Sequence, residues 1–387
     1  MKILFSSDVS FHYFGKAYPG DDKAITAMKE VKPFFAQSDF SVINLETTFG
    51  YPEDHTPIKK SGPNQISSPE FIKYIESLAP SAAGLANNHT LDFGEKPLFN
   101  TVNALNEMGI KTFGAGANIN DAYNPICFEQ NDIRVAVIGV CENEFGTAKE
   151  DKAGSAGYSL GMVTAAIQSA ISSGYMPIIF FHGGNEYCPF PAPSKKELYR
   201  HFVDIGAGAV IAMHTHCPQG YELYRGAPII YSMGNFYFPA PPYTNKPRYK
   251  VWSYGYMSLL TFENGKTAVE IVPYKQDFEG IHILHGRERE HFEKYLDTIS
   301  LPIANDELLQ RYFYAWCIKE SRPSKLKKRL NLADGNFAHI KNMFCCEAHN
   351  DTLRTEATVR FEEKENALTE LISDIKQLQE MEIPNKK

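Results

Sequence analysis

Short apolar segments alternate with amphipathic segments over about the first 235 residues, and this alternation constrains the fold more than any other feature. Two amphipathic segments, residues 96–109 and 194–207, repeat apolar side chains at helical spacing, and Ser194 is a suitable N-cap for the second. The apolar segments have the length and the β-branched or aromatic content of buried strands, namely 2–7, 40–46, 82–87, 133–141, 176–182 and 209–214. Strands that alternate with helices predict an α/β architecture.

The sequence changes character after this part. Residues 227–238 and 253–274 have the pattern of successive strands, and the second range predicts a hairpin that turns at residues 263–265. The proline-rich residues 238–249 predict a surface loop between them. From about residue 281 the sequence becomes helical in pattern and highly charged.

Composition and charge argue against several classes of protein. The chain carries 39 basic and 46 acidic residues, a net charge of −7, whereas a nucleic-acid-binding protein normally has a basic stripe. No apolar run is long enough for a membrane helix, and polar Ser6, Ser7 and Asp8 interrupt the apolar start that a signal peptide needs. Seven cysteines without a CxxC pair argue against disulfides and a structural zinc site. We therefore expect a cytoplasmic protein without a membrane anchor, and homo-oligomer formation stays open.

Residues that bind cations stand at five of the predicted strand ends. They are Asp8, Asn44, Glu46, Asn88, His89, His182, Glu186, His214 and His216. The carboxyl ends of strands in an open α/β sheet converge on one crevice, so we expect these side chains to lie together. Imidazoles suit Zn, Fe, Ni or Cu, and carboxylates extend the choice to Mn. Two carboxylates, one carboxamide and three histidines are about the set that a two-metal site takes.

Each of these residues also has a simpler interpretation. A histidine after a strand commonly forms a hydrogen bond within a loop, Asp8 could cap a turn, and Glu46 could pair with a basic side chain. His214 and His216 would face the same way on any extended segment. Recurrence at five strand ends favours the metal interpretation, because independent accidents would seldom produce it.

Several motifs carry a resemblance to a known family. They follow one another along residues 1–275 and read SDVS from residue 7, VINLET from 42, GLANNHTLDFG from 84, FFHGGNEY from 180, AVIAMHTH from 209 and YSMGNFYF from 231. In these motifs the chain resembles the CapA family of poly-γ-glutamate capsule biosynthesis proteins, which is related to the calcineurin-like metallophosphatases. The resemblance implies a four-layer αββα sandwich, in which two β-sheets lie between helices, with a helical appendage at the C-terminal end.

The resemblance also implies a set of site residues. Six positions match metal ligands of that family: Asp8, Glu46, Asn88, His182, His214 and His216. By analogy the site would hold two divalent ions (Mn, Fe or Zn) with Glu46 as the bridging carboxylate. Asp8 and His216 would bind one ion, and the other three residues would bind the second. His89 would stand just outside the ligand set as a proton donor.

The chain departs from the family pattern in its first motif. The family usually has Gly-Asp followed by an arginine, whereas this chain has Ser7-Asp8 without an arginine in the next few residues. Recognition of an anionic substrate would then need another cation, such as Lys59 or Lys60. The candidates for substrate contacts are Asn44, Lys60, Glu186, His12 and Asn235.

Two classes of function follow from these residues. In the first, the chain is a hydrolase that uses a metal-activated water to cleave phosphoesters, or amide bonds between γ-glutamyl units. In the second, the same cleft binds or processes an acidic polymer such as poly-γ-glutamate without hydrolysis. An anionic small molecule or an acidic polymer is the expected ligand in both classes.

The C-terminal part of the sequence predicts an accessory region. We divide the chain into a domain of residues 1–280 and a mostly helical region of residues 281–387. The aromatic side chains within residues 311–316 need an apolar surface to bury against, so we expect this region to cover or flank the cleft. The segment CCEAHND, residues 345–351, either packs a cysteine inward or contributes to the cleft.

Overall fold

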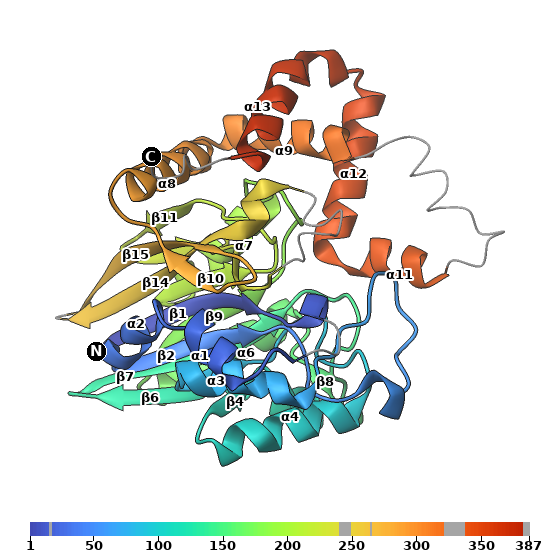
Figure 1. The fold of residues 1–387 in the computed structure, drawn as a ribbon. Helices are drawn as coiled ribbons and strands as arrows, with labels where there is room; N and C mark the ends of the chain where they lie inside the picture. The colour runs from blue at the N-terminus through green and yellow to red at the C-terminus, as the bar shows by residue number, and fades with distance from the viewer. Residues whose placement is uncertain (15–17, 240–248, 264, 321–336, 382–387) are drawn as a thin grey trace.

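The apolar runs of the sequence form the central strands of two β-sheets that lie face to face (Figure 1). The computed structural model describes residues 1–14, 18–239, 249–263, 265–320 and 337–381. Helices cover the outer face of each sheet, so the predicted four-layer αββα sandwich is confirmed. Further helices from the C-terminal part of the chain lie along one side of the sandwich.

The first sheet contains eight strands within the described ranges. Seven of them follow the order β16 (Ile281–Ile283), β15 (Lys266–Gln276), β14 (Tyr254–Glu263), β1 (Lys2–Val9), β2 (Phe40–Leu45), β3 (Ala82–Gly84) and β4 (Lys111–Phe113). The eighth strand, β13 (Asn235–Tyr237), pairs with the end of β1. The strands from β1 to β4 run parallel, and β14, β15 and β16 form an antiparallel extension.

The second sheet contains six strands among the described residues. Their order is β11 (Tyr221–Tyr224), β12 (Ala227–Ile230), β10 (Ala209–Met213), β9 (Met176–His182), β7 (Ile133–Cys141) and β6 (Ile126–Gln130). The four central strands are parallel, and the two edge strands are antiparallel to their neighbours. A small separate sheet joins β5 (Ala115–Gly116) and β8 (Gly154–Ser155).

Alternating side chains divide the interior into layers. On β1, Ile3 and Phe5 face the second sheet and belong to the central core, whereas Leu4 faces the helices on the other side. Phe5 and Phe180 meet across the two sheets with their ring centroids 6.1 Å apart. The helices that cover the two outer faces are α1 (Asp21–Ala27), α2 (Lys32–Gln37), α3 (Ile72–Leu78) and α4 (Glu95–Glu107) on the first sheet, and α5 (Ile119–Ala122), α6 (Leu160–Ser172) and α7 (Pro193–Asp204) on the second.

The C-terminal helices pack against the same central core. Phe292 and Phe313 are buried in it, and the Tyr312 ring lies 4.5 Å from the Phe190 ring, centroid to centroid. These helices are α8 (Gly286–Ser300), α9 (Asp306–Glu320), α11 (Phe337–Cys345), α12 (Glu347–Phe361) and α13 (Thr369–Gln379). No helix in the described ranges has both the length and the apolar character needed to cross a membrane.

Several local expectations need correction or fall outside the description. Ser194 is not the N-cap of α7: the helix begins at Pro193 after the N-cap residue Ala192, because proline supplies a suitable first helical position. The expected hairpin is present as β14 and β15, but Asn264 of its turn lies outside the described residues, as do residues 240–248 of the expected proline-rich loop. The predicted strand at 82–87 is shorter, since pairing ends at Gly84.

Candidate metal centre

Strand ends from both sheets bring the six predicted ligands together. Asp8 lies near the end of β1, Glu46 follows β2 and Asn88 follows β3. His182 is the last residue of β9, and His214 follows β10. All five side chains are buried. The carboxyl ends of the parallel strands therefore gather carboxylates, an amide and imidazoles in one place, as open α/β sheets generally do.

Four of these side chains present ligand atoms to one another at the end of β9. His182 Nε2 lies 3.1 Å from Asn88 Oδ1 and 3.0 Å from His214 Nδ1. The same nitrogen lies 3.7 Å from Glu46 Oε1. Ligands about 2.1 Å from a tetrahedral ion lie about 3.4 Å from one another. The observed separations suit that geometry, so the four residues could hold an ion between them.

A second group of ligand atoms adjoins the first and shares Glu46 with it. One ligand atom from each of Asp8, Glu46 and His216 lies within 4.8 Å of the others. The ring of His216 is oriented by Asn235, because His216 Nδ1 lies 2.8 Å from Asn235 Oδ1. With the proton on Nδ1, the ring donates to this amide and keeps Nε2 available for an ion. Asn235, which is expected as a substrate contact, is thus a hydrogen-bond partner of the predicted ligand His216.

Asp8 is fixed by two hydrogen bonds. Asn44 Nδ2 donates to Asp8 Oδ1 at 2.8 Å, and the backbone N–H of His214 donates to Oδ2 at 3.0 Å. Asn44 Nδ2 also lies 3.2 Å from His182 Nδ1. Asn44 is also expected as a substrate contact, and in the structure its amide contacts two of the predicted ligands, Asp8 and His182.

Glu46 is the buried group at the centre whose surroundings best suit a cation. Its side chain is fully buried, and neither carboxylate oxygen accepts a hydrogen bond from any described residue. Burial, reinforced by the nearby Asp8, Glu186 and Glu144 carboxylates, raises the pKa of the Glu46 carboxyl well above its usual range. A buried carboxylate without partners is strongly destabilising unless a cation compensates it. The donor set therefore fits divalent metal ions.

The backbone that carries the last two histidines is strained. His214 has φ 98° and His216 has φ 54°, a region that side-chain-bearing residues seldom occupy. The two residues are not alternate positions of an extended segment, because β10 already ends at Met213. Such strain costs about 1–3 kcal/mol per residue and is concentrated at functional sites. Burial and the neighbouring imidazoles lower the pKa of His214 well below its usual value, so its ring is neutral, as a metal ligand must be.

His89 lies beside the ligands in a hydrogen-bond network of its own. Its Nδ1 lies 2.6 Å from Asp92 Oδ2, and the Gln65 amide nitrogen lies 2.8 Å from its Nε2. The Nε2 atom is 3.8 Å from Glu46 Oε1. Burial, with a further contribution from Lys60, lowers the pKa of His89 to about 4. The ring is therefore neutral at pH 7, with its Nδ1 proton directed at Asp92.

The remaining substrate candidates are Lys60, Glu186 and His12. Lys60 is buried, and its ammonium donates to Asp92 Oδ1 at 2.6 Å and to the Asn88 carbonyl at 3.2 Å. Lys60 therefore holds the loop that carries Asn88, His89 and Asp92. Glu186 is exposed and follows β9, and its charge contributes to the raised pKa of Glu46. His12 lies in a short 3₁₀ helix, and its backbone N–H donates to Ser10 Oγ at 3.3 Å.

Glu144 is a site residue that sequence reasoning missed. Its Oε1 lies 3.7 Å from His214 Nε2, and its Oε2 accepts from Asn88 Nδ2 at 3.4 Å. Glu144 follows β7 by three residues, so it lies at the carboxyl end of a central strand, as the predicted ligands do. The strand-end rule that selected the other residues would have found it. Gln65 and the contact of Asp92 with His89 were also missed, since no spacing in the sequence indicates them.

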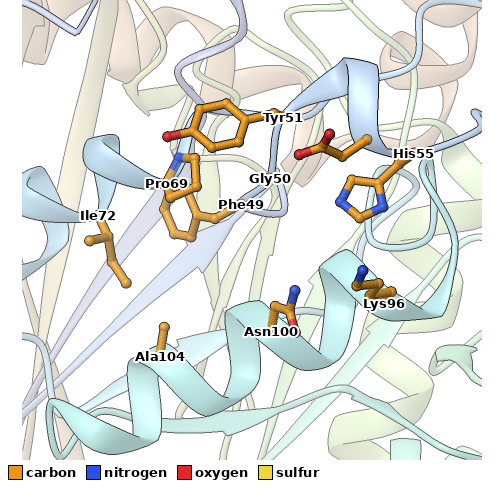
Figure 2. Close-up of a pocket in the computed structure, with 10 residues that line it drawn as sticks. Phe49, Gly50, Tyr51, His55, Pro69, Ile72, Lys96, Asn100 and Ala104 are labelled. Carbon is orange, nitrogen blue, oxygen red and sulfur yellow. The ribbon is translucent and has the colours of Figure 1, made fainter.

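A surface pocket lies away from the ligands. It has a volume of about 590 Å³ and is bordered by α4 and the segment that follows Phe49 (Figure 2). The side chains of Tyr51, His55 and Lys96 line it. None of the predicted metal ligands belongs to this lining. The pocket is therefore a feature of the surface that is separate from the ligand cluster.

Comparison with known proteins agrees with the motifs. The chain is 28% identical over 218 residues to the capsule biosynthesis protein CapA of Bacillus anthracis, which covers 54% of this chain and 53% of the relative. It is 24% identical over 241 residues to the PGA biosynthesis protein CapA of Bacillus subtilis, covering 62% and 63%. The matches thus span between about half and two thirds of these curated relatives.

The similarity to solved structures is weaker. A structure described as a novel phosphatase from Mycoplasma pneumoniae covers 72% of this chain and 94% of its own length, at 12% identity and a TM-score of 0.44. That score is too low to support a conclusion about activity. The family model of the bacterial capsule synthesis protein PGA_cap, by contrast, matches residues 2–240, which is well over half of the chain. The chain therefore belongs to the PGA_cap family of bacterial capsule synthesis proteins.

Proposed function

We propose that the chain is a metal-dependent hydrolase that holds two divalent ions of Mn, Fe or Zn and cleaves phosphoester bonds. One observation carries the proposal: Glu46 is buried, its two carboxylate oxygens have no hydrogen-bond partner among the described residues, and both groups of ligand atoms include it. When bound, two such ions would activate a water molecule and offset the charge of the transition state.

The proposed roles of the ligands follow from their contacts. Asp8 and His216 would hold one ion, and Asn88, His182 and His214 the other, with Glu46 between them. The amides behind the ligands would fix their orientation, since the Asn235 amide lies against His216 and the Asn44 amide against Asp8. Such supporting contacts typically change metal affinity or activity by about 10–100-fold when removed.

His89 is the proposed proton carrier. With a pKa lowered to about 4, the ring has no proton on Nε2 at pH 7, so it is prepared to accept a proton before it donates one. We propose that Nε2 takes a proton from the attacking water and returns it to the leaving group. Asp92 would hold the Nδ1 proton throughout, and Lys60 would keep Asp92 ionised through their ion pair.

A γ-glutamyl amide is the second candidate substrate. The Bacillus relatives are named for capsule and PGA biosynthesis, and a Mycobacterium tuberculosis relative, 28% identical over 214 residues, is named a probable polyglutamine synthesis accessory protein. The same ligand set could polarise an amide carbonyl, because two-metal sites serve aminopeptidases as well as phosphatases. Binding of an acidic polymer without cleavage is the competing function, and the experiment below separates it.

The test uses the purified full chain, loaded in turn with Mn²⁺, Fe²⁺ or Zn²⁺. Metal content is measured first, followed by turnover of aryl phosphate monoesters and diesters, γ-glutamyl anilides and poly-γ-glutamate. Asp8→Asn is the ligand variant, and Glu107→Gln, an exposed change on α4, is the matched control. We expect turnover only with metal, at least about 10²-fold lower in Asp8→Asn. A folded, metal-loaded chain that binds poly-γ-glutamate but leaves every phosphoester and γ-glutamyl bond intact would establish the non-hydrolytic function instead.

A further inference from the structure

We propose that Glu144, Cys346 and His349 form a separate binding site for one zinc ion. One ligand atom from each of the three residues lies within 4.8 Å of the others. Glu144 follows β7 in the sandwich, whereas Cys346 and His349 belong to the start of α12. Figure 1 shows α12 and α11 along one side of the sandwich. The site would therefore join a part of the chain inside the family match to a part beyond residue 240.

The chemistry of the three groups favours zinc. A thiolate, an imidazole and a carboxylate are all zinc ligands, and three protein ligands with a fourth position open to water are typical of reactive zinc sites. Thiolate is a soft ligand that Mn²⁺ and Mg²⁺ do not favour. The charges also balance, because an ionised Glu144 and an ionised Cys346 together neutralise one divalent ion. Cys346 would release its thiol proton to solvent as the ion binds.

Position on the helix brings the two C-terminal ligands onto one face. Cys346 is the N-cap residue of α12, and His349 lies three positions later, where side chains of a helix are neighbours. Cys346 is buried and its Sγ lies 3.6 Å from Glu142 Oε2. His349 is exposed, so the proposed site is open to solvent on one side and an ion could enter it.

The start of α12 is held in place by contacts outside the proposed ligand set. Asn143 donates to Glu347 through its backbone N–H at 3.0 Å and through its side chain at 2.7 Å. Asn185 Nδ2 donates to the Ala348 carbonyl at 3.1 Å and to Thr352 Oγ1 at 2.9 Å. These hydrogen bonds tie the first turns of α12 to the strand ends. They arrange the three ligands before an ion binds, which lowers the entropy that binding must overcome.

The proposed site adjoins the candidate metal centre but differs from it in chemistry. Glu144 Oε1 is 3.7 Å from His214 Nε2, so the two sites are neighbours. The proposed ligands of the centre are carboxylates, an amide and imidazoles, and they include no cysteine. A spectroscopic signal that requires a thiolate therefore reports on the new site alone.

The experiment is a Co²⁺ titration of the full chain under reducing conditions, because Co²⁺ takes the place of Zn²⁺ and gives a thiolate-to-metal charge-transfer band in the near ultraviolet. We expect the wild type to show this band and Cys346→Ser to lack it. Cys345→Ser is the matched control, since Cys345 is the adjacent cysteine, is exposed and lies outside the cluster. It should keep the band. Asp8→Asn should also keep it, which separates this proposal from the proposed function.

A second variant tests the site in case Cys346→Ser fails to fold. His349→Gln changes an exposed side chain, so the fold should survive, and we expect the Co²⁺ affinity read from the band to fall by about 10²-fold or more. Zn²⁺ should displace Co²⁺ and abolish the band. The proposal is overturned if saturating Co²⁺ gives no thiolate band in the wild type, if Cys346→Ser keeps the band, or if His349→Gln leaves the affinity unchanged.

Discussion

Replacement of Glu46 by glutamine should stabilise the metal-free protein, and added metal should shift the difference in stability toward the wild type. The carboxylate is buried without a hydrogen-bond partner among the described residues, and burial raises its pKa well above the usual range. Glutamine keeps the size of the side chain and removes the ionisable group. Without metal the variant should therefore be the more stable protein, and saturating metal should shift the difference in stability toward the wild type.

The magnitude without metal follows from the direction of the pKa shift. The folded protein binds the Glu46 proton more tightly than the unfolded chain does, whose pKa is about 4.3. The stabilising contribution of this proton is complete below about pH 4.3 and is lost as the pH rises toward the raised pKa, by about 1.4 kcal/mol per pH unit. Glu46→Gln escapes this loss, because glutamine does not titrate. Its advantage over the metal-free wild type should thus grow with pH across that window and then level off.

Metal binding acts in the opposite direction. An ion present at about 1,000 times its Kd stabilises the folded state by about 4.1 kcal/mol. If the loss of the shared carboxylate weakens affinity about 100-fold, the same ion concentration stabilises the variant by only about 1.4 kcal/mol. The wild type then gains about 2.7 kcal/mol over the variant from metal binding. This gain reverses the order of stabilities only within about two pH units above 4.3, where the metal-free advantage of the variant is smaller.

Chemical denaturation at several pH values, in chelator and in Mn²⁺ or Zn²⁺, measures both effects. Glu107→Gln is the control, because Glu107 is exposed at the end of α4 and should give no metal-dependent difference. The reasoning is refuted if Glu46→Gln is less stable than the wild type in chelator at every pH, or if added metal leaves the difference between the two stabilities unchanged.

Two further predictions concern the proton carrier and the C-terminal region. His89→Ala should retain metal and lose about 10²–10⁴-fold in turnover. His182→Ala should lose metal affinity, because His182 Nε2 lies 3.1 Å from Asn88 Oδ1 and 3.0 Å from His214 Nδ1, whereas His89 Nε2 approaches only Glu46 Oε1, at 3.8 Å, among the predicted ligand atoms. Metal analysis and turnover of both variants check this, and equal loss of metal in the two would contradict it. A chain of residues 1–280 should aggregate although it keeps every proposed ligand, because removal of α8 and α9 uncovers the core around Phe190. Size-exclusion chromatography tests this; a monodisperse, active fragment would show that the division at residue 280 separates independent modules.

The central strands could be predicted because their physical signal is strong. Parallel strands covered on both faces are apolar at nearly every position, and all six predicted segments contain a strand. The short strands β4 and β16 gave no such signal, since each has only three residues and lies at a sheet edge. β16, at Ile281–Ile283, pairs with β15 just after the boundary placed at residue 280.

The site could be predicted in its composition but not in its contacts. A rule about strand ends selects Asp8 and His182 without any knowledge of distances. It does not reveal that the Lys60 ammonium forms an ion pair with Asp92, because 32 positions separate these residues in the sequence. Nor does it reveal the positive φ angle of His214, because the sequence there reads as the continuation of a strand.

The distribution of supporting contacts favours metal chemistry over simple polymer binding. Asp8 accepts from Asn44, and the rings of His216 and His89 lie against Asn235 and Asp92 respectively. Glu46 belongs to both groups of ligand atoms, and its carboxylate has no hydrogen-bond partner among the described residues. A surface that only binds an acidic polymer gains nothing from a buried carboxylate, which would repel that polymer and destabilise the fold. Cations beside Glu46 would remove both penalties, and the same cations would be the electrophiles that hydrolysis needs.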